Sequence, residues 1–156
     1  MKESKFTKYC YNAIYGDNGF TDNLTTLSPE DDVATKTRGC NWRIPTYEEM
    51  QELLDNCTEE WTTINNKNGY ILTSTISEHT DKSIFLPAAG YKDSDVEALE
   101  TQEFGHYWTS SLFEDFSDPG HAYFLWVSKP GDWLPLEISN LQRYYGLSVR
   151  PVYDGN

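Results

Sequence analysis

The segment 45–57 constrains the fold more than any other part of this 156-residue chain. Thr46 is followed three residues later by Glu49, which is the pattern of a capping box at the start of a helix. Apolar residues then recur at positions i, i+3, i+4 and i+7, namely Met50, Leu53, Leu54 and Cys57. This spacing predicts a helix over 47–56 with one apolar stripe, on which Leu53 and Leu54 are buried.

A shorter helix is predicted just before this segment. Ser28 can serve as its N-cap and Pro29 suits the first helical position. The acidic run 30–32 favours the positive end of a helix, and Gly39 would end it. Glycine, asparagine and aspartate crowd residues 16–23, which indicates a loop.

The rest of the chain reads as short strands separated by turns. The cluster 65–69 predicts a turn, and the runs Tyr70–Ile76 and Ser83–Leu86 predict a hairpin. Further strands are expected at 106–111, 121–127 and 147–152, with turns at 118–120 and 129–132. Two short helices followed by a mostly antiparallel set of short strands predict a single α+β domain over 1–156, with a loop-rich start at 1–19.

The acidic balance of the chain limits its partners. Lysine and arginine number 12 against 25 aspartates and glutamates, for a formal net charge of -13. Nucleic-acid binders need basic surface that releases counterions from phosphate, and anionic membranes attract the same kind of surface. We therefore expect no nucleic-acid partner. The sequence carries no apolar run typical of a signal peptide or a membrane span, so we expect no membrane insertion by this segment.

Residues of the kind that carry catalysis or bind metal are few and scattered. The three histidines lack metal-ligand spacing, and Cys10, Cys40 and Cys57 form no Cys-x-x-Cys pair. The sequence allows one disulfide among these cysteines and leaves its partners open. No nucleophile elbow or glycine-rich phosphate loop is present. We expect no catalytic residue, no cofactor and no required metal.

Aromatic side chains are interleaved with charged ones between residues 108 and 145, and such patches mark interaction sites when they are exposed. The residues predicted to contact a ligand are Phe113, Phe116, Asp118, His121, Phe124, Trp126, Lys129, Trp133, Arg143 and Tyr144. Trp133 stands beside Gly131 and Pro135 in a predicted loop, where burial is less common. For the strand 121–127, which is apolar on both faces, we give equal weight to a second interpretation, a core strand buried on both sides.

Several short motifs occur in order along the chain and resemble one family. They are Trp42–Thr46 with Glu49, Glu52–Cys57, Asn68–Tyr70, Ile84–Tyr91, Tyr107–Ser111 and Gly146–Val152. Together they resemble the Fibrobacter succinogenes major paralogous domain, which is common in gut Bacteroidota and often found on exported lipoproteins. That family is similar to C-type-lectin-like domains, so the resemblance implies a C-type-lectin-like fold. Its members usually have more sequence before this starting point, which implies a truncated or minimal form here.

A second resemblance concerns the region between the last two motifs. A Trp-x-Ser-Ser segment, an irregular stretch and an Arg-Pro-Val ending are similar to variable proteins of diversity-generating retroelements. The resemblance implies that Trp108–Ser111 and Gly146–Val152 are scaffold and that the residues between them form a variable binding face. The calcium motifs of lectins, such as Glu-Pro-Asn and Trp-Asn-Asp, are absent from the sequence.

These patterns predict a non-catalytic adhesin or receptor-binding domain at the cell surface, outside the cell or on a phage particle. Its partner is expected to be a protein or glycan on another cell or phage surface. The first alternative is a carbohydrate-binding module of a surface lipoprotein. The second is an enzyme of the formylglycine-generating type, against which the sequence argues because its cysteines match no catalytic pair.

Two arginines sit inside apolar frames, Arg43 between Trp42 and Ile44 and Arg150 between Val149 and Pro151. An arginine side chain in such a frame can satisfy its five donors with backbone carbonyls or a carboxylate. We therefore expect both to be structural.

Overall fold

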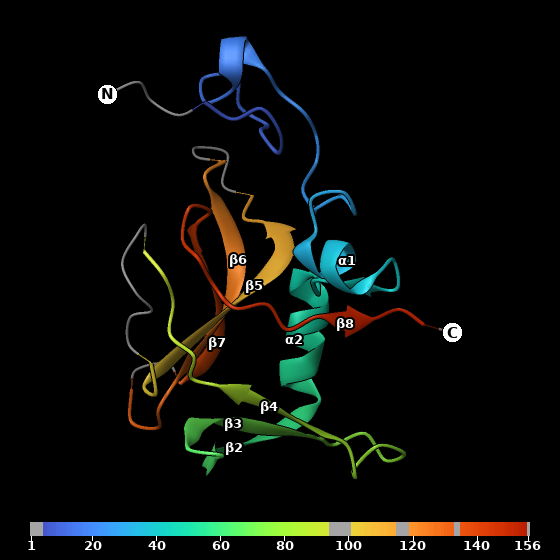
Figure 1. Cartoon of the computed structure of the whole chain (residues 1–156), viewed down its shortest axis with the longest axis vertical. Helices are drawn as coiled ribbons and strands as arrows, with labels where there is room; N and C mark the ends of the chain where they lie inside the picture. Colours follow the sequence, from blue (N-terminus) through green and yellow to red (C-terminus); the bar gives the residue numbers. More distant parts are fainter. Residues whose placement is uncertain (1–4, 94–100, 115–118, 133–134, 156) are drawn as a thin grey trace.

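The computed structural model describes residues 5–93, 101–114, 119–132 and 135–155 of the chain (Figure 1). Its helical elements are the 3-10 turn η1 (Asp17–Gly19) and the helices α1 (Val33–Arg38) and α2 (Tyr47–Asp55). Its strands are β1 (Trp42–Arg43), β2 (Cys57–Ile64), β3 (Lys67–Ser74), β4 (Ser83–Pro87), β5 (Phe104–Leu112), β6 (His121–Ser128), β7 (Leu136–Gln142) and β8 (Val152–Tyr153). The predicted α+β class is confirmed.

The strands form three small sheets in which every pair is antiparallel. One sheet has the order β2-β3-β4, another has the order β5-β6-β7, and β1 pairs with β8. In Figure 1 the β2-β3-β4 sheet lies at the bottom of the view, and α2 runs down towards it beside the β5-β6-β7 sheet. The short β1–β8 pair joins residues from the first third of the chain to its C-terminal end.

Helix α2 forms where the capping box predicts it. The Thr46 hydroxyl accepts a hydrogen bond from the Glu49 backbone N–H, and the Glu49 carboxylate accepts one from the Thr46 N–H. Of the apolar stripe, Met50 is fully buried, whereas Leu53 and Leu54 are half-buried against the core. The prediction that these two leucines are buried is therefore met only in part, because both pack on the core but stay half-buried.

Helix α1 begins later than the sequence pattern predicts. Its N-cap is Asp32, whose carboxylate accepts hydrogen bonds from the N–H groups of Ala34 (2.7 Å) and Thr35 (3.1 Å). The same carboxylate accepts a third bond from the Ile44 N–H at 2.7 Å. This tertiary contact favours Asp32 over Ser28, which instead starts a turn that precedes the helix. Gly39 ends α1 as predicted, at a φ of 100°.

The hairpin β2–β3 was missed by sequence reasoning, which placed a turn over 65–69. Only Asn65 and Asn66 form that turn, with φ of 50° and 62°, and asparagine tolerates the left-handed region better than most residues. Strand β2 then pairs residue by residue with β3, from Cys57 opposite Ser74 to Ile64 opposite Lys67. The predicted strands at 70–76 and 83–86 are confirmed as the paired strands β3 and β4, apart from their ends.

The C-terminal third of the chain differs from the prediction in two places. Strands β5 and β6 confirm the predicted strands at 106–111 and 121–127. Strand β7 was not predicted, and the predicted strand at 147–152 is wrong. Within 146–151 only Gly146 and Ser148 form isolated bridges, with Ser148 bonded to the backbone of His106 and Trp108. Of the predicted strand, only Val152 belongs to a strand, β8.

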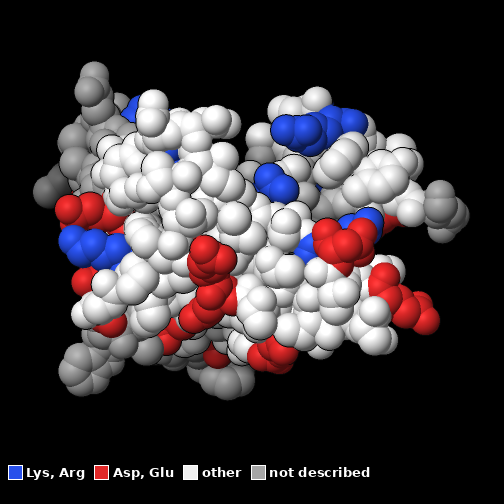
Figure 2. All heavy atoms as spheres, turned by 90° about the horizontal axis from the view of Figure 1, so that it is seen from below, with Lys and Arg blue, Asp and Glu red and all other residues white. Residues whose placement is uncertain are grey.

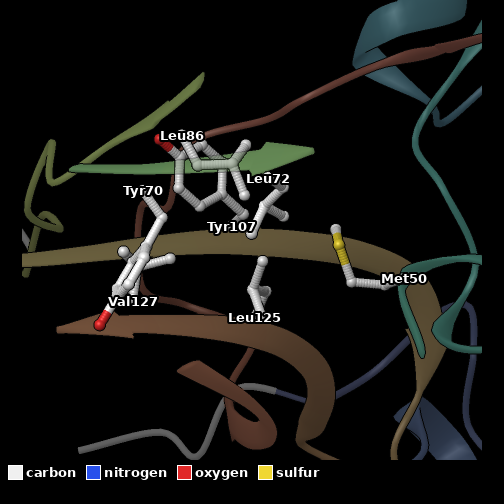
Figure 3. Packing of buried hydrophobic residues seen from close by; sticks show 7 residues of the cluster. All are labelled: Met50, Tyr70, Leu72, Leu86, Tyr107, Leu125 and Val127. Carbon is white, nitrogen blue, oxygen red and sulfur yellow. The ribbon is translucent and has the colours of Figure 1, made fainter. Parts of the chain in front are cut away.

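The main core lies between the two three-stranded sheets and α2. Figure 3 shows seven buried side chains that converge there from α2, β3, β4, β5 and β6, namely Met50, Tyr70, Leu72, Leu86, Tyr107, Leu125 and Val127. The Tyr107 hydroxyl donates a 2.6 Å hydrogen bond to the Pro87 carbonyl, which satisfies its polar end inside the core. This packing holds the β5-β6-β7 sheet, on which the predicted contact residues His121, Phe124 and Trp126 lie.

Candidate binding face

The two faces of strand β6 are both occupied by packed side chains. Leu125 and Val127 point into the main core, whereas Phe124 and Trp126 lie on the other face. Across the sheet, Trp126 stands opposite His106 and Phe124 opposite Trp108, so these four rings share one face. The interpretation of β6 as a core strand buried on both sides therefore holds for its second half, from Phe124 to Ser128, where only Trp126 is half-buried.

Phe124 is a core residue, and its predicted role as a ligand contact is wrong. Its ring is only 2% exposed and lies 5.2 Å from His106 and 6.2 Å from Trp126. A ring enclosed in this way has no surface to present to a ligand. Trp126 remains half-buried, with its indole 4.6 Å from the imidazole of His106.

Three tyrosine rings in contact connect these buried rings to the surface. The Tyr91 ring lies 4.9 Å from His106 and 5.9 Å from Tyr145, and Tyr145 stacks on Tyr144 at 4.5 Å with an interplanar angle of 29°. Tyr144 is 66% exposed. A hydrogen bond between the two tyrosine side chains raises the pKa of Tyr145 to about 12. The pair, which we call the tyrosine platform, thus presents an aromatic ring to solvent on an ordered support.

The predicted residues Phe113, His121 and Arg143 come together at one end of the sheet. The Phe113 N–H donates to the His121 carbonyl at 3.1 Å, and the Arg143 N–H donates to the Gly120 carbonyl at 2.8 Å. The Arg143 guanidinium lies 4.2 Å from the centre of the Phe6 ring, a cation–π contact. Arg143 is therefore partly engaged in holding the N-terminal segment against the sheet.

Lys129 lies at the opposite end of β6 from His121 and forms a 3.2 Å ion pair with Glu103. Because the strand separates Lys129 from His121, the predicted contact residues do not form one continuous patch. The predicted contacts Phe116, Asp118 and Trp133 lie outside the described residues.

Two aromatic features escaped the sequence reasoning. Tyr145 and Tyr91 were not predicted as site residues, although Tyr145 adjoins the predicted Tyr144. A second cluster joins Tyr123 to Tyr47 at 4.5 Å and to Phe113 at 5.2 Å. Tyr47 belongs to α2, so no local pattern in the sequence could place it beside β6.

The cysteines form no disulfide, and the described His, Cys, Asp and Glu side chains form no metal-binding group. All three cysteines are free; Cys10 is buried, Cys57 half-buried and Cys40 exposed. Within the described ranges, no set of three His, Cys, Asp or Glu side chains is arranged to hold a metal ion. The described helices include none with the length and apolar character needed to cross a membrane.

Comparison with known proteins finds no matching family model, no matching curated protein and no matching solved structure.

Proposed function

We propose that the chain is a non-catalytic ligand-binding domain with a C-type-lectin-like fold, acting as an adhesin or receptor-binding domain outside the cell or on a phage particle. The observation that carries this proposal is the tyrosine platform. Tyr144 is 66% exposed, yet its ring is stacked on Tyr145 and anchored through Tyr91 to buried aromatic side chains. An ordered, exposed aromatic ring gives large contact area at low entropic cost, which suits a binding anchor.

The arrangement of strands supports the fold assignment. Small antiparallel sheets follow two short helices, and β8 pairs with β1, which brings the end of the domain back to the strand before α2. The platform lies in the segment between the scaffold motifs Trp108–Ser111 and Gly146–Val152. Such a position suits a face that varies among relatives, as in the variable proteins of diversity-generating retroelements.

The ligand is a protein or a glycan on another cell or phage surface. The stacked, exposed face of Tyr144 favours a glycan as the second candidate, since a sugar ring can lie flat on an aromatic ring. Replacing Tyr144 by alanine tests both. We expect Tyr144→Ala to lose binding to a panel of bacterial surfaces or a glycan array and to keep the parent melting temperature.

Tyr153 supplies a matched control, because it is also an exposed tyrosine, at 56%, but belongs to β8. Tyr153→Ala should retain binding on the same panel and array. Equal binding by parent and Tyr144→Ala would remove the platform from the site. Loss of binding in both variants would point to a general effect of the substitution rather than to a site at Tyr144.

A further inference from the structure

A second concave site is lined by no residue of the β5-β6-β7 sheet among the described residues. It is a cleft of about 490 Å³ between α2, the β3–β4 hairpin and the C-terminal residues 150–152. Ligand pockets commonly have volumes of about 300–1,000 Å³. None of its lining residues belongs to the tyrosine platform. Figure 2 views the end of the molecule that carries β2, β3 and β4, where basic and acidic atoms gather around a hollow on the right.

The walls of this cleft are mainly apolar. Met50 and Leu53 come from α2, Ile84 and Leu86 from β4, and Ile76 from the hairpin loop. Met50 and Leu86 are also part of the buried core, so the floor of the cleft is rigid. Ile76 is 45% exposed, and a hydrocarbon chain in the cleft would remove its apolar surface from water.

Two of the charged side chains that line the cleft, Glu49 and Lys82, are already paired. The Glu49 carboxylate accepts hydrogen bonds from both terminal nitrogens of Arg43, at 2.6 and 2.5 Å. Lys82 donates to the neighbouring Asp81 at 2.6 Å. These groups therefore contribute little net charge to a ligand in the cleft.

Arg150 is different, and here the structural role expected for it is wrong. Its side chain is exposed, and within the described ranges its guanidinium makes no hydrogen bond or ion pair. A guanidinium has a fork of donors that matches both oxygens of a carboxylate. Glu52 also lines the cleft and would repel a nearby anion. Arg150 would therefore attract an anionic ligand in the cleft, and Glu52 would weaken its binding.

We propose that this cleft binds an aliphatic carboxylate, with the hydrocarbon chain between α2 and β4 and the carboxylate on the Arg150 guanidinium. The site is independent of the proposed adhesin function. It would take free monocarboxylates whose chain is long enough to reach from Arg150 over Ile76 to the apolar floor.

Cys57 offers a direct readout, because its half-buried thiol lines the cleft. Cys10 is fully buried, so Cys40→Ser leaves Cys57 as the one partly accessible thiol of the chain. Burial raises the pKa of the Cys57 thiol, so its alkylation is followed at mildly alkaline pH. We expect octanoate to slow this alkylation in a saturable way, whereas octan-1-ol and octylamine protect much less.

Charge variants in the Cys40→Ser background test the orientation of the ligand. Arg150→Gln should weaken octanoate binding about tenfold, the usual effect of losing a hydrogen bond to a charged group. Arg150→Lys should keep part of the affinity, and Glu52→Gln should increase it. Tyr144→Ala should bind octanoate like the parent, so this test and that of the adhesin proposal can fail separately.

Three results would overturn the proposal. The first is no protection of Cys57 by octanoate at millimolar concentration. The second is equal protection by octanoate and octan-1-ol together with no effect of Arg150→Gln. This result would mean that the cleft binds apolar chains without recognising the carboxylate. The third is stronger protection by octylamine that Glu52→Gln abolishes. This result would mean that the cleft prefers a cationic ligand.

Discussion

His106 stands edge-on to the indole of Trp126, with the ring centroids 4.6 Å apart and an interplanar angle of 69°. Tyr91 and Phe124 flank the same imidazole at 4.9 and 5.2 Å. The imidazole is 2% exposed, and neither of its nitrogens has a hydrogen-bond partner among the described residues. Because a charged imidazolium would lose its hydration there without compensation, burial lowers the pKa of His106 to about 4.

This burial predicts a loss of stability in mild acid. Between pH 6.5 and 4 the unfolded chain binds a proton at His106 that the folded chain does not, so the free energy of unfolding falls as pH falls. The expected loss between pH 7 and pH 4.5 is about 2 kcal/mol. His106→Phe should remove this part of the pH dependence. Urea denaturation of both proteins at the two pH values measures it.

Exposed His79 provides the control for this experiment. His79→Gln should keep the pH dependence of the parent, because the side chain lies at the surface. Changes in the carboxylates are common to all three proteins and cancel in the comparison. Parallel stability curves for parent and His106→Phe would show that His106 is not the group that titrates.

Arg43 and Arg150 are predicted to differ in their effect on stability. Arg43 bonds to both oxygens of Glu49 and, at 2.5 Å, to the carboxylate of Asp154, so it ties α2 to the C-terminal end of the chain. This network is partly exposed, and Arg43→Gln should cost about 1 kcal/mol. Arg150→Gln should cost almost nothing. Melting curves at low and high salt measure both, and an equal loss for the two variants would contradict this assignment.

The loss of stability on truncating side chains of α2 should depend on how deeply each side chain is buried rather than on its residue type. Met50→Ala removes a fully buried side chain and should cost about 2–5 kcal/mol. Leu54 is half-buried, so Leu54→Ala should lie at the lower end, near about 2 kcal/mol. Asp55→Ala, on the exposed side of the helix, is the control. A larger loss for Leu54→Ala than for Met50→Ala would show that the stripe is packed differently.

Gly69 allows β3 and β4 to approach closely. A Cβ atom at this position would lie 2.2 Å from the Leu86 carbonyl oxygen, and backbone atoms cannot move aside without breaking the strand pairing. Gly69→Ala should cost about 1–3 kcal/mol, as overpacking does. At Gly146 the nearest atom is the Lys92 Cβ at 3.1 Å, part of a surface side chain, so Gly146→Ala should cost less. Urea denaturation of the two variants measures both losses of stability.

The parts of the fold that the sequence predicts are those with local signals. The capping box at Thr46 and the two apolar runs of the β3–β4 hairpin each contain their own pattern, and all three form. Strand β2 was missed because most of its residues are polar and exposed, with Trp61 packing on Tyr70 at 5.0 Å. The start of α1 was missed because the bond from Ile44 to Asp32 connects residues that are distant in sequence.

The candidate site was only partly predictable for the same physical reason. The pattern of β6 shows that both faces are apolar, but it does not show what covers each face. Tyr91 and Tyr145, which flank the outer face beside His106 and Trp126, come from segments far from β6 in sequence. They cover the outer face beside His106, whereas Phe124 is enclosed by the rings of His106, Trp108 and Trp126, and Tyr144 stays exposed on Tyr145. The exposure of each ring thus depends on tertiary contacts that no strand pattern contains.

Truncation to alanine should lower the stability of the protein at Trp126 and leave it unchanged at Trp133. Trp126 packs edge-on against His106 and lies 5.4 Å from Phe104, so it supports the outer face of the sheet. Trp126→Ala should therefore cost about 3–5 kcal/mol of stability, the usual effect of removing a packed aromatic side chain. Trp126→Phe keeps a ring beside His106 and should recover much of this loss.

Trp133 lies outside the described residues, and its predicted role as a surface anchor follows from its place between Gly131 and Pro135 in the sequence. Trp133→Ala should keep the parent melting temperature in the absence of ligand and should weaken binding by at least about 2 kcal/mol, as hot-spot residues do. The measurement is a melting curve of Trp133→Ala beside parent and Trp126→Ala. A loss of stability as large as that of Trp126→Ala would place Trp133 in the core. The binding face would then depend on Tyr144 and the residues around it.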